Sequence, residues 1–130
     1  MSARILIVDD EEIVIRSCLR ILADTGYVVD VARGSLEALK KIDETHYDVL
    51  VVDIMMPQVS GLEVLKHVKH KRPTSEVIIF TGLAQSETAL SARKLGAFAY
   101  LPKPFEPDEI LQMIAQALAK HPSCGEQPAQ

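Results

Sequence analysis

Short apolar runs alternate with amphipathic segments along most of this chain. The runs are rich in Val, Ile and Leu, a pattern typical of strands that are buried on both faces of a sheet. They predict five strands, over residues 4–8, 27–32, 47–52, 76–80 and 97–101. The segments between them repeat apolar residues at three- and four-residue spacing, which predicts helices over residues 11–25 and 86–95 and helices that begin near Ser35, Gly61 and Pro107.

The first helix has an apolar face that is expected to pack on the core. It consists of Ile15, Cys18, Leu19 and Leu22. Gly26 supplies the stop at the end of this helix, because glycine accepts the left-handed backbone that often ends helices. Ser35 is the expected N-cap of the second helix, since a serine hydroxyl can accept a hydrogen bond from the first turn.

Strands that alternate with helices imply a parallel sheet with helices on both faces. Five such units predict an α/β fold of the flavodoxin-like, doubly wound type, with strand order 2-1-3-4-5 and the strand over residues 27–32 at an edge. Residues 1–120 are expected to form this one domain. Residues 121–130 are polar and contain Pro and Gly, which predicts a disordered tail or the start of a linker.

The composition fits one globular domain of 130 residues and excludes several functions. The chain has 14 basic and 18 acidic residues, and the resulting net charge of −4 argues against binding to nucleic acid through bulk electrostatics. We find no apolar run long enough to span a bilayer and no signal peptide, so no membrane partner is expected. Cys18 and Cys124 are too far apart in the sequence to suggest a disulfide framework, so a reducing cytoplasm is the expected compartment.

Polar side chains follow the apolar runs at the points where four predicted strands end. They are Asp9, Asp10, Asp53, Thr81 and Lys103. The carboxyl ends of parallel strands meet at one edge of a sheet, and this edge is where such folds bind ligands. Carboxylates gathered there repel one another unless a cation lies among them. The pattern therefore predicts a divalent metal, with an anion between the metal and Lys103.

Taken singly, each of these residues has a structural explanation as a helix cap, a turn or a surface charge, and their joint placement is what favours a shared site. His67 and His70 share a helix face, but the neighbouring lysines favour a solvated basic surface over a metal site. We find no glycine-rich phosphate loop and no Ser-His-Asp set placed for nucleophilic catalysis.

Four motifs in order make the chain resemble a known family. They are Ile7-Val8-Asp9-Asp10-Glu11, Asp53-Ile54-Met55-Met56-Pro57 with Gly61-Leu62-Glu63, Thr81-Gly82, and Tyr100-Leu101-Pro102-Lys103-Pro104-Phe105. Together they resemble the receiver domain of two-component response regulators, over about residues 3 to 120.

The resemblance implies a role for each residue at the predicted sheet edge. Asp53 is expected to accept a phosphoryl group from a phosphohistidine of a partner kinase or phosphotransfer protein. Asp10, Asp53 and the main-chain carbonyl of Met55 are expected to bind Mg²⁺, with Asp9 acting mainly through a metal-bound water. Lys103 is expected to hold a phosphoryl oxygen.

The resemblance also implies a switch. The Thr81 hydroxyl is expected to move toward the phosphoryl group, and Tyr100 to turn into the space that it leaves. This motion would change the surface made by the fourth helix, the fifth strand and the last helix, which would regulate a downstream protein or a covalently linked output domain. The same surface is a candidate for homodimer formation.

Other interpretations stay open at this point. The chain could be a stand-alone receiver or the N-terminal receiver of a larger transcriptional regulator or hybrid kinase. It could also be a pseudo-receiver that binds partners without phosphorylation. A phosphatase of the haloacid dehalogenase type is disfavoured, because such an enzyme needs a second Asp two residues after the nucleophile, where Asp53 is followed by Met55. We therefore expect no enzyme activity beyond the domain's own phosphorylation and dephosphorylation.

Overall fold

A computed structural model describes residues 3–53, 61–81, 92–102 and 105–120 of the chain, with the backbone alone at Thr81. Its elements follow the predicted alternation of strand and helix. In chain order they are β1 (Arg4–Val8), α1 (Glu12–Leu22), β2 (Val28–Ala32), α2 (Ser35–Glu44), β3 (Val49–Asp53), α3 (Gly61–Lys71), β4 (Glu76–Thr81), β5 (Ala99–Pro102) and α5 (Pro107–Lys120).

The five strands form one parallel sheet with the order β2-β1-β3-β4-β5, as predicted. β1 therefore lies between β2 and β3, and the chain crosses over β1 between its second and third strands. In register, Val8 pairs with Val52, and Asp53 pairs with Phe80 of β4. This register brings the carboxyl ends of β1, β3 and β4 to the same edge of the sheet.

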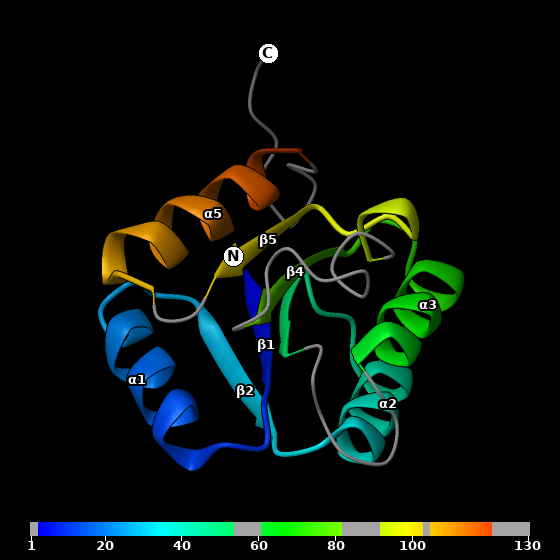
Figure 1. Cartoon of the computed structure of the whole chain (residues 1–130), viewed down its shortest axis with the longest axis horizontal. Helices are drawn as coiled ribbons and strands as arrows, with labels where there is room; N and C mark the ends of the chain where they lie inside the picture. The colour runs from blue at the N-terminus through cyan, green and yellow to red at the C-terminus, as the bar shows by residue number, and fades with distance from the viewer. Residues whose placement is uncertain (1–2, 54–60, 82–91, 103–104, 121–130) are drawn as a thin grey trace.

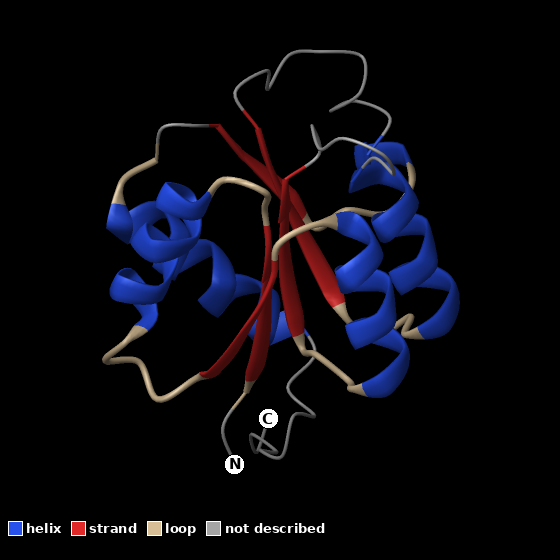
Figure 2. Cartoon of the chain, turned by 90° about the horizontal axis from the view of Figure 1, so that it is seen from below, coloured by secondary structure: helices blue, strands red, loops and turns tan. Residues whose placement is uncertain are grey.

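The two faces of the sheet carry separate cores, because successive side chains of a strand point to opposite faces. Leu6, Val8, Leu50 and Val52 pack with residues of α2 and α3. The residues between them in sequence pack with residues of α1 and α5; these include Ile5, Ile7, Val49 and Val51. Figure 2 shows the resulting three layers, with the sheet between two layers of helices.

The ends of the helices correct two local predictions. Gly26 and Gly96 have φ values of 85° and 106°, a backbone conformation that favours glycine. Gly96 closely follows the helical residues 92–94, but α1 ends at Leu22 with Ala23 as its C-cap, so Gly26 lies three residues beyond the C-cap and does not supply the predicted stop. Ser35 does not cap α2. It is the first residue of the helix, Gly34 occupies the N-cap position, and no side chain caps this end.

The predicted core face of α1 is partly wrong. Ile15, Cys18 and Leu22 are buried, but 37% of Leu19 is exposed. The α-helix turns by about 100° per residue, which places Leu19 at the margin of the face that these three residues share. The other apolar neighbours on this helix, Val14 and Ile21, pack from the opposite side of the same face.

Several predictions concern parts of the chain outside the described residues. Of the predicted helix over residues 86–95, residues 92–94 are helical and most of the remainder is not described. The residues following Asp53 up to position 60 and the predicted tail over residues 121–130 also lie outside the described ranges. The domain boundary at residue 120 therefore remains a prediction.

Candidate functional site

Three carboxylates meet at the carboxyl edge of the sheet. Asp9 and Asp10 follow β1, and Asp53 is the last residue of β3, the strand beside it. One carboxylate oxygen from each of the three lies within 4.8 Å of one from each of the others. The sequence prediction that these side chains would gather at one edge is confirmed.

The environment of the three carboxylates differs. Asp9 is fully buried and Asp53 is only 3% exposed, while Asp10 is exposed to solvent. The Oδ1 atom of Asp9 accepts a hydrogen bond of 2.8 Å from the backbone N–H of Glu11, which fixes this carboxylate against the start of α1. The cluster thus has two side chains held by the fold and one that opens it to solvent.

The donor set of this cluster fits a hard divalent cation. Carboxylate oxygens are the ligands that Mg²⁺ prefers, and Mg²⁺ usually keeps several waters, so a few protein ligands suffice. Two buried acidic side chains next to a third also gain from a cation, because it offsets the repulsion between them. Of the predicted metal ligands, the fold brings Asp9, Asp10 and Asp53 together. Met55, the fourth, lies outside the described residues.

Of the predicted phosphoryl contacts, the structure describes little. Thr81 ends β4, one residue beyond Phe80, the register partner of Asp53, so its backbone lies at the same edge as the acidic cluster. The side chain of Thr81 and the whole of Lys103 lie outside the part of the chain that the structure describes. The roles of both residues remain predictions.

The predicted switch residue Tyr100 lies on β5, an edge strand, and is partly buried against the core on the α2 and α3 side. Its ring lies 5.5 Å from the guanidinium carbon of Arg93, the distance of a cation–π contact. Tyr100 therefore has an apolar side in the core and a charged neighbour at the surface.

An ion pair beside the acidic cluster was not predicted from the sequence. The Nε atom of Arg33 donates to the Oε1 atom of Glu12 at 2.9 Å, and a terminal guanidinium nitrogen donates to Oε2 at 3.2 Å. These hydrogen bonds hold the pKa of the Glu12 carboxyl below its usual value and raise the pKa of Arg33. The pair joins the start of α1 to the segment after β2.

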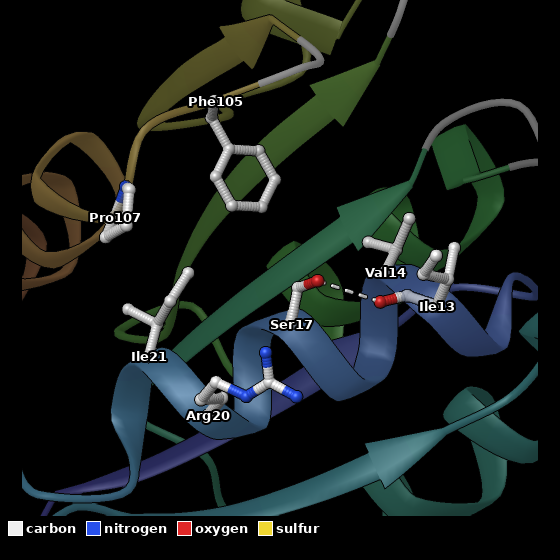
Figure 3. Close-up of a pocket in the computed structure, with 7 residues that line it drawn as sticks. All are labelled: Ile13, Val14, Ser17, Arg20, Ile21, Phe105 and Pro107. Carbon is white, nitrogen blue, oxygen red and sulfur yellow. Dashed lines mark hydrogen bonds between the residues drawn. The ribbon is translucent and has the colours of Figure 1, made fainter.

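An apolar groove of about 530 Å³ lies beside the same edge of the domain, between α1 and the segment that leads into α5. Figure 3 shows Phe105 and Pro107 across the groove from the side chains of α1. On α1 the groove is lined by Ile13, Val14, Ser17, Arg20 and Ile21. Ile13 is 75% exposed although it is apolar, and it lies three residues after Asp10.

The histidines on α3 form no metal site with their neighbours among the described residues. The Nε2 atom of His67 lies 2.7 Å from the Oδ1 atom of Asp43 on α2, and Lys71 lies 3.2 Å from the same oxygen. The two hydrogen bonds hold the pKa of Asp43 below its usual value. His70 is exposed, which agrees with the solvated basic surface predicted for this helix. His67 instead links α3 to α2 through its contact with Asp43.

A set of Ser, His and Asp does occur at the opposite edge of the sheet. The Oγ atom of Ser75 lies 3.5 Å from Nε2 of His46, and Nδ1 of His46 lies 4.0 Å from a carboxylate oxygen of Asp48. Ser75 is fully buried and its hydroxyl donates to the carbonyl of Tyr47 at 2.5 Å. A buried hydroxyl whose proton is already engaged cannot attack a substrate, so this set is structural.

Comparison with known proteins points to one family. A family model described as the response regulator receiver domain matches residues 5–115. The transcriptional regulatory protein DltR of Streptococcus agalactiae is 39% identical over 111 residues, which are 85% of this chain and 50% of that protein. The regulatory protein AtoC of Escherichia coli is 38% identical over 115 residues, which are 88% of this chain and 25% of that protein. The chain thus spans half or less of the length of these two relatives.

The fold agrees with these matches. A response regulator receiver domain protein (CheY-like) of Methanospirillum hungatei superposes with a TM-score of 0.88 at 34% identity, covering 92% of this chain and 96% of the other.

Within the described ranges, none of the helices has the length and apolar character needed to cross a membrane.

Proposed function

This chain belongs to the response regulator receiver domain family, and we propose that Asp53 is the residue at which it accepts a phosphoryl group. The observation that supports this role is the position of Asp53 at the end of β3, 3% exposed and within 4.8 Å of two further carboxylates. A lone surface aspartate would have no such neighbours. The chain would then act as a phosphorylation-controlled switch of a two-component system, in the cytoplasm.

Asp10 and Asp53 would bind Mg²⁺ directly, together with the main-chain carbonyl of Met55, and Asp9 would act through a bound water. When bound, the ion supplies positive charge that reduces the repulsion between the carboxylate of Asp53 and an anionic phosphoryl group. The hydrogen bond from the Glu11 N–H to Asp9 would keep that carboxylate in place.

In the transfer itself, a carboxylate oxygen of Asp53 attacks the phosphorus of a phosphohistidine. The new oxygen–phosphorus bond forms as the bond between phosphorus and the imidazole nitrogen breaks, and the imidazole leaves with the electron pair. Lys103 would hold a phosphoryl oxygen as a point charge. Phosphoryl transfer depends chiefly on positioning and charge neutralisation, which these groups would supply.

The phosphodonor protein would dock beside the site on the groove between α1 and the start of α5 (Figure 3). The groove is open and mostly apolar, and Arg20 and Ser17 supply polar groups. An amphipathic helix of the donor fits such a groove, with apolar side chains inserted against Ile13 and Phe105. This arrangement would place a phosphohistidine of the donor near Asp10, at the solvent side of the acidic cluster.

The output would follow from the predicted movements of Thr81 and Tyr100. Phosphorylation would favour one of two conformations of the surface near β5 and α5, which would regulate a partner, a second copy of this chain, or an output domain in the same protein. The larger size of DltR and AtoC favours the last of these, a receiver within a longer regulator.

The experiment that tests the proposal is intact-mass measurement after incubation with Mg²⁺ and acetyl phosphate. We expect one phosphoryl group on the wild-type protein and none on Asp53→Asn or in the presence of EDTA. Asp24→Asn is the matched control, because Asp24 is an exposed aspartate beyond the far end of α1. If the wild type gains no phosphoryl group although it binds Mg²⁺, the chain is a phosphorylation-independent binding module.

A further inference from the structure

The chain leaves β1 and β2 at neighbouring points of the sheet edge that carries the acidic cluster, before it turns toward α1 and α2 (Figure 1). The last register pair of these strands joins Val8 to Ala32. The backbone N–H of Asp9 then donates to the carbonyl of Ala32 at 3.2 Å, which continues the pairing beyond the strands. Arg33 is the next residue, so its backbone lies about one strand spacing, roughly 5 Å, from that of Asp9.

Arg33 is held at this edge by hydrogen bonds of both its side chain and its backbone. Two guanidinium nitrogens donate to the two carboxylate oxygens of Glu12, at 2.9 and 3.2 Å. The backbone N–H of Arg33 donates to the side chain of Glu37 at 3.0 Å. The guanidinium is therefore fixed next to Glu12, the first residue of α1, which lies two residues along the chain from Asp10 of the acidic cluster.

The charge around the cluster makes this cation relevant to the reaction. Four consecutive acidic residues, positions 9–12, and Asp53 repel any small anionic phosphodonor. Two described cations pair with this acidic run through Glu12. Arg33 lies at the strand ends, whereas Arg16 lies one turn further along α1, 3.4 Å from Glu12.

We propose that Arg33 is a second cationic contact for the phosphoryl group of small phosphodonors, kept in place by Glu12 until the donor arrives. Both side chains of the pair are about half exposed, and such exposed pairs contribute little to stability, so a more highly charged anion can replace Glu12 at small cost. The planar guanidinium also offers two parallel donors that match phosphoryl oxygens. This inference rests on the proposed phosphorylation of Asp53.

The test is the rate of phosphorylation by acetyl phosphate with saturating Mg²⁺, followed by intact mass at several salt concentrations. We expect Arg33→Gln to react about threefold to tenfold more slowly than the wild type, with a weaker dependence on salt. Arg16→Gln is the matched control, because it removes the same charge from the same carboxylate partner and should react within about twofold of the wild type. Equal rates for the two variants would overturn the proposal.

Two further variants separate direct contact from an effect through Glu12 or through charge alone. In a Glu12→Gln background, Arg33→Gln should still slow the reaction, whereas an effect that disappears would mean that Arg33 acts through Glu12. Arg33→Lys keeps the charge but loses the two parallel donors, so it should fall between wild type and Arg33→Gln. If Arg33→Lys is phosphorylated as rapidly as the wild type, the positive charge of Arg33 alone attracts the donor. That result would overturn the proposed direct contact.

A binding measurement gives a readout without phosphoryl transfer. With Mg²⁺ present, inorganic phosphate should shift the NMR signal of the Arg33 Nε–H group and leave that of Arg16 nearly unchanged. Equal shifts, or no shift of Arg33, would contradict the proposal. If the wild type itself accepts no phosphoryl group, the proposed function fails; if it does so and Arg33→Gln behaves like Arg16→Gln, only the present inference fails.

Discussion

The guanidinium carbon of Arg93 lies 5.5 Å from the centre of the Tyr100 ring. Arg93 is exposed, and Tyr100 is partly buried on the edge strand β5. The guanidinium of Arg93 thus covers part of a side chain that the sequence predicts to be a switch. A cation–π contact at an exposed site contributes only about 0.5–1 kcal/mol. It can therefore bias the position of the ring without fixing it.

Replacing Arg93 by Gln should loosen the Tyr100 ring with little effect on the fold. We expect the free energy of unfolding to fall by no more than about 1 kcal/mol, since one exposed contact is lost. NMR of ring-labelled tyrosine should show wider averaging of the Tyr100 signals. The neighbouring exposed cation, Lys94, provides the control variant Lys94→Gln, and the same averaging in both variants would show that the Arg93 contact does not restrain the ring.

Removal of Mg²⁺ should change stability through the acidic cluster. An ion that binds the folded state alone stabilises it, by about 2.7 kcal/mol at one hundred times its dissociation constant. We expect Mg²⁺ to raise the Tm of the wild type and of Asp24→Asn, and to raise that of Asp10→Asn much less. Calorimetry with Mg²⁺ and with EDTA measures these differences.

The same variant should have the opposite effect without the ion. Asp10→Asn removes one of three neighbouring negative charges, so in EDTA its Tm should equal or exceed that of the wild type. A variant that is less stable in EDTA and equally responsive to Mg²⁺ would show that Asp10 is a structural residue and not a metal ligand.

The meeting of Asp9, Asp10 and Asp53 could be predicted because it follows from chain topology alone. Continuous apolar runs identified the strands, the intervening helices made the sheet parallel, and parallel strands end at one edge. No side-chain geometry was needed for this step.

Features that depend on contacts between distant segments could not be predicted in this way. The ion pair of Glu12 and Arg33 joins positions 21 residues apart and leaves no periodic signal in the sequence. The groove beside α1 depends equally on where Phe105 approaches the helix. The exposure of Leu19 was missed because periodicity assigns a residue to a face but does not fix how wide the covered part of that face is.

Tyr47 should give the domain a distinct alkaline transition. Its side chain is buried and its hydroxyl donates to an oxygen of Asp30 at 2.7 Å; burial, followed by this partner, raises the pKa of Tyr47 to about 12. The unfolded chain releases the same proton near pH 10. The contribution to stability is therefore complete below about pH 10 and is lost as the pH rises toward 12.

Ultraviolet titration of tyrosinate should show one group near pH 12 that is absent from Tyr47→Phe. Unfolding measurements should show a weaker loss of stability between pH 10 and 12 in the variant, because its ring cannot ionise. At neutral pH the variant should be less stable by about 1 kcal/mol, since the hydrogen bond to Asp30 is lost. Identical titration curves for the two proteins would contradict the assignment.

Phe80 should be among the most costly residues to truncate. It is fully buried in β4, and its ring meets that of Phe105 edge to face, with the ring centres 5.8 Å apart. Replacing Phe80 by Ala should lower the free energy of unfolding by about 3–5 kcal/mol, because a cavity forms in the core between the sheet and α5. Phe105→Leu should cost less, since Phe105 is partly exposed and Leu retains much of the volume. Urea unfolding of the two variants measures both values. Both variants lose the edge-to-face contact, so a loss for Phe80→Ala no larger than that for Phe105→Leu would contradict a large cavity cost at Phe80.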